Sequence, residues 1–139
     1  MVIEDKISIQ DIILLQQLSE QNLSKTSLKL TFFDMLQILK KHNLQPYIKI
    51  GKIKETIIGY CLYSFPNEND VQISHLVLAK EWQGKGKAAE FFQDLMVNFP
   101  NKNLTADISY DNEHSKRFFE KHHFTFSKED QKSRWNVKL

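Results

Sequence analysis

The sequence of 139 residues has a single cysteine, no long apolar run and little net charge. Its single cysteine, Cys61, excludes an intrachain disulfide and a cysteine-cluster metal site, and its apolar neighbours predict a buried thiol rather than a nucleophile. No apolar run approaches the ~20 residues that cross a bilayer, and residues 1–5 lack the segments of a signal peptide. A net charge of +2 gives no argument for a nucleic-acid partner. We therefore expect a cytoplasmic protein that uses no metal, no membrane and no nucleic acid.

The length predicts one domain over residues 1–139, because the chain can bury one core and is too short for two substantial domains. Apolar residues at helical spacing predict a helix from about 9 to 20, with a start at Ser8 and Asp11 that resembles a capping box. The same spacing recurs between Leu28 and Leu39. Runs rich in β-branched and aromatic residues then predict three strands, at 47–51, 56–64 and 71–78.

The second half of the chain alternates between the two kinds of element. Apolar spacing predicts a helix from Ala88 to before Pro100, and a second helix is expected from Asn112 to about Lys121. Short strands are expected at 104–108, 124–126 and 135–139. The order is therefore ααβββαβαββ, which predicts an α/β protein of the α+β type with a mixed sheet.

Two of the four glycines, Gly84 and Gly86, lie between the strand that ends at residue 78 and the helix that begins at Ala88. A helix N-terminus has unpaired backbone N–H groups and a partial positive charge, and glycine lets a phosphate approach them closely. Three lysines, at positions 80, 85 and 87, add positive charge. The turn predicts a site for a phosphate or pyrophosphate group. Neither G-x-x-x-x-G-K-[ST] nor G-x-G-x-x-G is present, which makes a nucleotide- or nucleic-acid-binding domain the weakest interpretation.

The pattern Gln-x-x-Gly-x-Ala at residues 83–88 resembles the pyrophosphate-binding motif of the Gcn5-related N-acetyltransferase (GNAT) family. The preceding residues 76–82, an apolar strand followed by Lys-Glu-Trp, and residues 112–124, an Asn that opens a helix, resemble the family on either side, so the similarity covers about residues 71–126. It implies a GNAT-like fold, acetyl-coenzyme A as cosubstrate, and transfer of acetyl to a primary amine of a small molecule or peptide by direct attack in a ternary complex. A non-catalytic module that senses or scaffolds acetyl-coenzyme A is the alternative.

The resemblance also implies which residues hold the cofactor. The family uses backbone groups of the strand before the turn, the amides of the turn itself, and the Asn at the start of the later helix, which also caps that helix. The residues assigned to the cofactor are Leu76, Val77, Leu78, Gln83, Gly84, Lys85, Gly86, Lys87, Ala88, Ala89, Asn112 and Phe119.

Two residues are candidates for the general base. Asp107 matches an acidic position used by the family branch that acetylates N-terminal amines of ribosomal proteins, although an Asp in a short strand can equally face water or pair with a lysine. His75 is the alternative base, because histidine titrates near working pH, although a lone histidine in a strand is more often structural. Alternation along the strand places Ser74 and His75 on opposite faces unless a bulge intervenes.

The general acid departs from the family pattern, because Phe119 stands where relatives often have a tyrosine that protonates the leaving thiolate. Tyr110 and His122 are the nearest substitutes in the sequence, although a loop aromatic and a polar helix end explain them as well. His123 replaces a glycine of the family, which predicts a histidine in the left-handed region.

The acceptor amine is expected beside the first two helices, at about residues 20–36, and the last strands. This part of the chain contains Glu20, Phe32, Phe33 and Asp34, which suit a small amine, a polyamine or a peptide terminus. A homodimer is left open.

Overall fold

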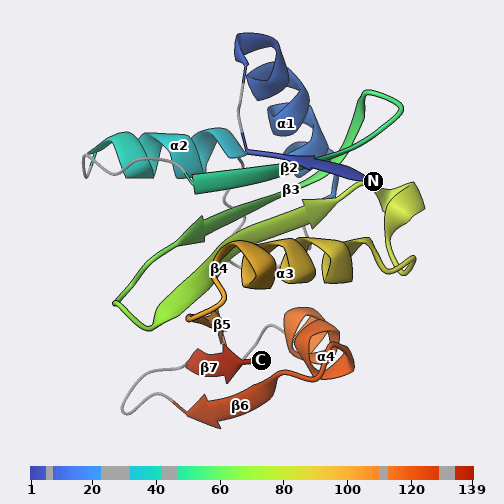
Figure 1. Ribbon diagram of the computed structural model, residues 1–139. Helices are drawn as coiled ribbons and strands as arrows, with labels where there is room; N and C mark the ends of the chain where they lie inside the picture. The colour runs from blue at the N-terminus through green and yellow to red at the C-terminus, as the bar shows by residue number, and fades with distance from the viewer. Residues whose placement is uncertain (6–7, 23–31, 42–46, 110–112, 129–133) are drawn as a thin grey trace.

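The computed structural model describes residues 1–5, 8–22, 32–41, 47–109, 113–128 and 134–139, and the described residues form a mixed sheet with helices on both faces (Figure 1). The seven described strands lie in the order β1-β2-β3-β4-β5-β7-β6. Their bounds are β1 Val2–Glu4, β2 Tyr47–Ile53, β3 Thr56–Ser64, β4 Asp70–Leu78, β5 Asn103–Ser109, β6 Thr125–Lys128 and β7 Arg134–Lys138.

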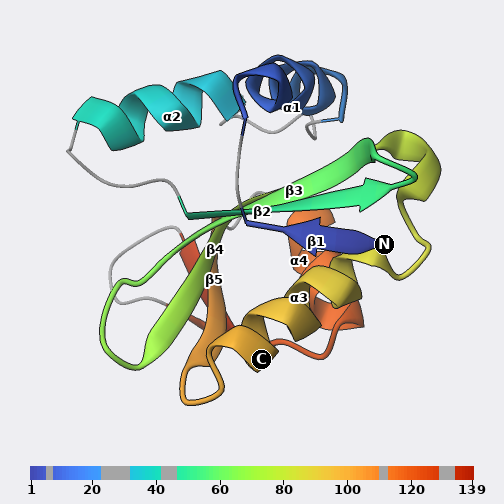
Figure 2. The ribbon, with the colours of Figure 1, turned by 45° about the horizontal axis from the view of Figure 1, so that its top comes forward.

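The helices divide between the two faces of the sheet (Figure 2). Helices α1 (Ile9–Asn22) and α2 (Phe32–Lys41) cover one face, whereas α3 (Lys87–Asn98) and α4 (Glu113–Lys121) cover the other. A 3₁₀ turn, η1 (Lys80–Trp82), connects β4 to α3. Among the described residues no helix is long and apolar enough to cross a membrane.

The predicted order of elements is confirmed, with one strand that the sequence pattern missed. Strand β1 has only three residues, too few for alternation to be visible, and it pairs antiparallel with β2 from Val2↔Lys52 to Glu4↔Ile50. An ion pair of 3.0 Å between Lys52 Nζ and Glu4 Oε2 ties the two strands together. The predicted capping box is also confirmed. The Ser8 amide donates to Asp11 Oδ2 at 3.1 Å, and the Asp11 amide donates to Ser8 Oγ at 3.2 Å.

Alternation along the strands produces two apolar cores, one on each face of the sheet. The core toward α3 and α4 includes Cys61, Phe91, Leu95, Leu104 and Phe119. The core toward α1 and α2 includes Leu15, Leu18, Ile50, Tyr60 and Val77. Cys61 is fully buried, as expected, and burial raises the pKa of its thiol to about 12, which keeps it protonated.

A lysine enters the core on the α3 face. Lys49 follows Ile48 on β2 and therefore points to the opposite side of the sheet, where it is buried beneath α3. Its Nζ lies 3.2 Å from Asp94 Oδ2 of α3, and Asp94 itself remains partly exposed. The ion pair compensates the charge that Lys49 carries into the core.

Helix α4 ends on the histidine that replaces the family's glycine, and the predicted left-handed residue is confirmed. His123 has φ of 68°. The Phe124 amide donates to the Phe119 carbonyl at 3.0 Å, and the His123 amide donates to the Glu120 carbonyl at 3.0 Å, which together form a Schellman motif. The rings of Phe119 and Phe124, with centroids 4.9 Å apart, supply the apolar contact typical of this motif.

We expect His123→Gly to increase the free energy of unfolding by about 1 kcal/mol, because glycine accepts the left-handed conformation without the steric cost of a side chain. Urea denaturation of the purified variant measures this change. The matched control is the exposed Glu120→Gly, in the interior of the last helical turn, which should be destabilising instead. A lower stability of His123→Gly would contradict the prediction.

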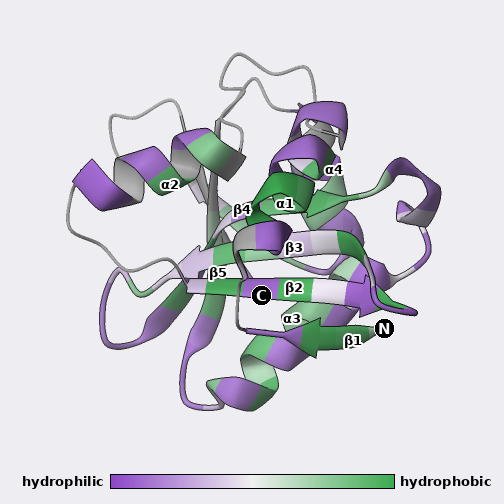
Figure 3. Ribbon diagram, turned by 90° about the horizontal axis from the view of Figure 1, so that it is seen from above, coloured by the Kyte–Doolittle hydropathy of each residue, from purple (hydrophilic) through white to green (hydrophobic). Residues whose placement is uncertain are grey.

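Helix α1 carries two exposed apolar side chains besides those that it buries. Seen from above, the ribbon of α1 includes hydrophobic stretches (Figure 3). Ile13 is 61% exposed and Leu14 is 49% exposed. The inner face of the same helix contributes Leu15 and Leu18 to the core, so apolar residues occur on both sides of α1.

Candidate functional site

The only parallel neighbours among the described strands, β4 and β5, separate along their length. Their register runs from Asp70↔Asn103 to Ile73↔Ala106, but β4 continues to Leu78 and β5 to Ser109. After Ala106, β5 pairs only with β7 among the described strands. After Ile73, β4 pairs only with β3 among these strands. The C-terminal half of β4 therefore has backbone groups on its β5 side that no described strand pairs.

A β-bulge in β4 marks the place where the strands separate. His75 pairs with Leu62 and Ile73 pairs with Tyr63, which leaves Ser74 without a partner across the strand. Ser74 is exposed, whereas the His75 ring contacts Tyr60 in the core toward α1 and α2. The bulge that the sequence left open is thus present, and it places His75 on the α1 side directly after the separation.

Strand β4 leads straight into the glycine turn at the start of α3. Gly84 and Gly86 have φ of 74° and 79°, and Gly86 is the N-cap of α3. A Cβ atom built on either glycine would meet nothing within 4 Å. Glycine is therefore favoured here by the backbone conformation and not by packing within the chain, and the space beside the helix start is open to another molecule.

The side chains of the turn are held in two ways. Gln83 Nε2 donates to the Leu78 carbonyl at 2.9 Å, and the Gln83 backbone amide donates to Lys80 O at 3.3 Å. That amide therefore has a partner within the chain, and the assignment of Gln83 to the cofactor stays a prediction. Lys85 and Lys87 place their Nζ atoms 5.3 Å and 5.7 Å from the centroid of Trp82, within cation–π range.

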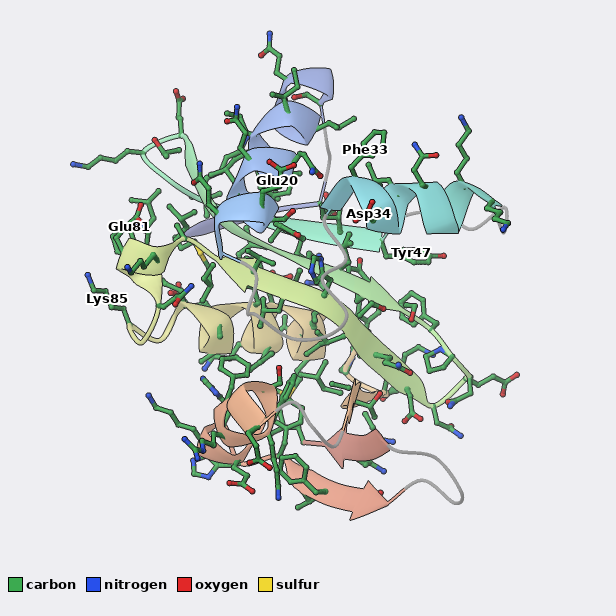
Figure 4. All side chains as sticks on the ribbon, turned by 180° about the vertical axis from the view of Figure 1, so that it is seen from behind. Glu20, Phe33, Asp34, Tyr47, Glu81 and Lys85 are labelled. Carbon is green, nitrogen blue, oxygen red and sulfur yellow. The ribbon has the colours of Figure 1, made fainter. Side chains whose placement is uncertain are left out.

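Lys85 and Lys87 differ in how much of their positive charge is available to a bound anion. Lys87 Nζ pairs with Glu90 Oε2 at 3.0 Å, so part of its charge is balanced within α3. Lys85 is exposed on the turn, where Figure 4 shows it projecting beside Glu81 of η1. Ala88 is buried and Ala89 half-buried in the first turn of α3, where helix amides have no intrahelical acceptor. The helix start, Lys85 and Lys87 together favour an anion at this turn.

The three strand residues assigned to the cofactor lie in β4 as expected. Val77 is buried toward α1, whereas Leu76 and Leu78 are partly buried against the core toward α3. Gly59 of β3 faces Leu78, and a Cβ at Gly59 would come within 2.8 Å of the Val77 carbonyl oxygen. The side chains thus serve packing, and the backbone is what this part of β4 can offer to a ligand.

Of the candidate catalytic residues, the structure describes the positions of some but not of others. Asp107 follows the last β4–β5 pair, on the part of β5 that pairs with β7 through Asp107↔Asn136. Tyr110 and Asn112 lie outside the described residues. His75 and Asp107 therefore stand on the two strands that separate, each just beyond their last shared pair.

Phe119 is buried in the core between α3 and α4. Its ring packs against Phe92, Phe118 and Phe124, with centroid distances of 6.4, 5.2 and 4.9 Å. The substitute donor His122 has its Nδ1 2.9 Å from the Phe118 carbonyl. The aromatic ring that replaces the family's tyrosine is thus part of the packing in this structure.

His75 has a partner that the sequence did not indicate. Its Nδ1 lies 3.0 Å from Tyr60 Oη, across the β3–β4 pair. Burial lowers the pKa of His75 from 6.5 to about 4, so the ring is neutral at neutral pH. Tyr60 was hidden in an apolar strand pattern, and only the register of β3 against β4 could have revealed it.

The proposed acceptor region is formed by the ends of two helices. Figure 4 shows Glu20 near the end of α1 and Phe33 and Asp34 at the start of α2. The Phe33 amide donates to Gln16 Oε1 at 2.6 Å, which joins the two helices, and Phe33 is 50% exposed. Phe32 begins α2, and its side chain lies outside the described residues.

A glycine turn at a helix start, directly after a strand whose edge is not paired by a described strand, suits a phosphate group at the helix N-terminus. The sequence model of the acetyltransferase (GNAT) family matches residues 11–124. The chain belongs to this family and is an N-acetyltransferase. Among curated proteins none matches the sequence significantly.

Solved structures agree in fold. An acetyltransferase from Thermus thermophilus is 17% identical with a TM-score of 0.75, covering 100% of this chain and 98% of the other. N-acetyltransferase PseH from Campylobacter jejuni, in complex with acetyl-coenzyme A, is 19% identical with a TM-score of 0.68, covering 99% and 98%. PaiA N-acetyltransferase from Thermoplasma acidophilum, in complex with coenzyme A, is 17% identical with a TM-score of 0.68, covering 99% and 98%.

Proposed function

We propose that this protein transfers the acetyl group of acetyl-coenzyme A to a primary amine, in a small molecule or at a peptide N-terminus, by direct attack in a ternary complex. The observation that carries the proposal is the alignment along one strand of a backbone edge that no described strand pairs, from Ser74 to Val77, with an open glycine turn. Family membership supports acetyl-coenzyme A as the donor.

The two parts of the site suit the two ends of the cofactor. The glycine turn offers helix-start amides and Lys85 to the pyrophosphate. The unpaired edge of β4 offers backbone N–H and C=O groups to the amides of the pantetheine arm, in the way that a neighbouring strand would. PseH and PaiA, which share the fold, have structures with acetyl-coenzyme A and coenzyme A.

Direct attack requires the amine to lose a proton and the leaving thiolate to gain one. Asp107 and His75 are the candidate bases, since they lie on the two strands beside the separation. Tyr110 is the candidate general acid, because Phe119 cannot protonate the leaving thiolate. The carboxylates near the ends of α1 and α2, Glu20 and Asp34, would favour a cationic acceptor.

The test is thiol release from acetyl-coenzyme A over a panel of primary amines, with coenzyme A binding measured separately by calorimetry. We expect binding without an amine and thiol release only when the accepted amine is present. Double-reciprocal plots that intersect would support a ternary complex, whereas parallel plots would indicate an acetyl-enzyme intermediate and contradict direct attack. Thiol release that depends on hydroxyl acceptors instead would contradict the amine.

The buried position of Phe119 gives a further prediction. We expect Phe119→Tyr to be destabilised by about 1–3 kcal/mol, because a hydroxyl added among Phe92, Phe118 and Phe124 would be buried without a partner. Urea denaturation measures the loss, with Phe126→Tyr on β6, where the ring is only partly buried, as the control. A gain in turnover with unchanged stability would show instead that the ring reaches the thioester sulfur.

A further inference from the structure

His75 has a buried nitrogen with nothing to bind. Its Nε2 has no hydrogen-bond partner among the described residues, although it is shielded from solvent. Buried polar side-chain atoms are nearly always paired, so an exception calls for an explanation such as a ligand. The residue as a whole is only partly buried, so the ring is not sealed inside the core.

The position of the ring fits a ligand in the transfer site. His75 comes directly after the bulge residue Ser74 and two residues after Ile73, the last residue of β4 that pairs with β5. The ring is fixed from the other side by Tyr60, whose ring lies edge-on to it with centroids 5.4 Å apart. Nδ1 is held by the Tyr60 hydroxyl, so Nε2 is the nitrogen left for another molecule.

The buried surroundings of the His75 ring favour one position for its proton. A side-chain hydrogen bond links Tyr60 to Ser19, and Ser19 Oγ donates to the Gln16 carbonyl at 3.3 Å. A carbonyl can only accept. With the proton on Nδ1, Nδ1–H of His75 donates to the Tyr60 hydroxyl and Nε2 is left as an acceptor. The opposite direction would leave Nε2–H as a buried donor without an acceptor, which is the rarer and costlier arrangement.

The charge states agree with this direction. With a pKa lowered by burial to about 4, His75 is neutral at pH 7 and Nε2 keeps its lone pair. Burial also raises the pKa of Tyr60 well above its usual range, with the bond to Ser19 acting in the other direction, so the hydroxyl keeps its proton. Among the residues that the structure describes, Tyr60 from β3 is the titratable group that contacts the ring, and Ser19 from α1 carries no charge.

We propose that His75 Nε2 accepts the proton that the acceptor amine loses, and that Tyr60 and Ser19 are positioning residues that hold the imidazole in its Nδ1–H form. The proposal rests on the proposed function. In the step, the acceptor reacts as the neutral amine, after its ammonium proton has passed to bulk water. The amine lone pair forms the C–N bond with the thioester carbonyl carbon, and the C–S bond breaks with its electron pair on sulfur. The amine proton passes to Nε2 and then to the thiolate, which leaves as the thiol.

One imidazole that takes and returns the proton removes the need for a separate acid. Phe119 cannot donate a proton, and the structure buries its ring in the core. An imidazolium in an environment that disfavours its charge gives up its proton readily. His75 is therefore favoured over Asp107 as the base. The same proton transfer explains how the reaction proceeds with Phe119 where relatives often have a tyrosine.

The first test is ¹⁵N NMR of protein with labelled histidine, which distinguishes protonated from unprotonated ring nitrogens. His75→Gln identifies the His75 signals among the five histidines. We expect protonated Nδ1 and unprotonated Nε2 in the free protein. Coenzyme A alone should leave the Nε2 signal in place, and coenzyme A with methylamine should shift it. A shift by coenzyme A alone would mean that Nε2 binds a pantetheine amide, which would overturn the role of base.

The second test compares the kinetics of matched variants. His75→Gln retains an acceptor atom but cannot take up the proton, so kcat should fall by ~10²–10⁴-fold while coenzyme A binding is unchanged. Tyr60→Phe should lower kcat by roughly five- to tenfold, the worth of one hydrogen bond, and should reduce the Nδ1–H form in the NMR spectrum. Tyr63→Phe is the control, since Tyr63 lies on the same strand but packs against Tyr47, Phe65 and Phe99 on the other face.

The outcomes separate the two hypotheses. A protonated Nε2 in the free protein, or normal kcat in His75→Gln with a large loss in Asp107→Asn, would overturn the assignment to His75 and leave the proposed function intact. Absence of coenzyme A binding by the wild-type protein would overturn the proposed function itself. The NMR measurement of the free wild-type protein decides the tautomer even if a variant fails to fold.

Discussion

Replacing Gly86 by glutamate is expected to weaken coenzyme A binding by at least ~100-fold, because a carboxylate at the N-cap of α3 would stand where the pyrophosphate binds and repel it. The added side chain meets no atom of the chain itself within 4 Å, so the effect should fall on the ligand more than on packing. Isothermal titration calorimetry with coenzyme A measures the affinity, and circular dichroism checks that the variant is folded.

Two controls separate charge from backbone strain. Gly86→Ala adds the strain of a side chain at φ of 79° without charge and should reduce affinity much less. Gln93→Glu adds the same charge at an exposed position further along α3 and should leave affinity unchanged. Unchanged binding in a folded Gly86→Glu variant would remove the glycine turn from the site.

The second large effect concerns stability. Asp94→Ala should lower the free energy of unfolding by about 3 kcal/mol, because it leaves the Lys49 ammonium buried on the α3 face without its partner at 3.2 Å. Chemical denaturation measures the loss. The double variant Lys49→Met/Asp94→Leu removes both charges and should recover most of the stability. A single variant as stable as the wild-type protein would show that Lys49 reaches water in another way.

The sequence predicts the fold where local patterns are long enough to be read. The helix of 9–20 was found from Ser8, Asp11 and the apolar spacing, and the strand of 56–64 was found in full. The three residues of β1 were missed, since their stability comes from pairing with β2 and from the Lys52–Glu4 ion pair, both distant in sequence. The buried Lys49 could not be foreseen either, because its partner Asp94 lies 45 positions further along the chain.

The sequence predicts those parts of the candidate site whose residues are neighbours in the chain. The glycine turn is contiguous, and glycine permits the positive φ angles that Gly84 and Gly86 have. His75 was visible as a candidate base, but its partner was not, because the contact with Tyr60 depends on the β3–β4 register and on a bulge that shifts it. The separation of β4 from β5 is likewise a property of the sheet and has no signature in either strand alone.

Gln16 of α1 makes hydrogen bonds with three other residues. Its Oε1 accepts the Phe33 amide at 2.6 Å, its Nε2 donates to Glu20 Oε1 at 2.7 Å, and its carbonyl accepts the Ser19 hydroxyl at 3.3 Å. The start of α2 is thereby connected, through α1 and Tyr60, to the imidazole on β4. In hydrogen-exchange terms, we expect the end of α1 and the start of α2 to open together. An acceptor that binds between these helices would slow exchange in both and, through the same residue, reduce the freedom of the ring that we assign to proton transfer.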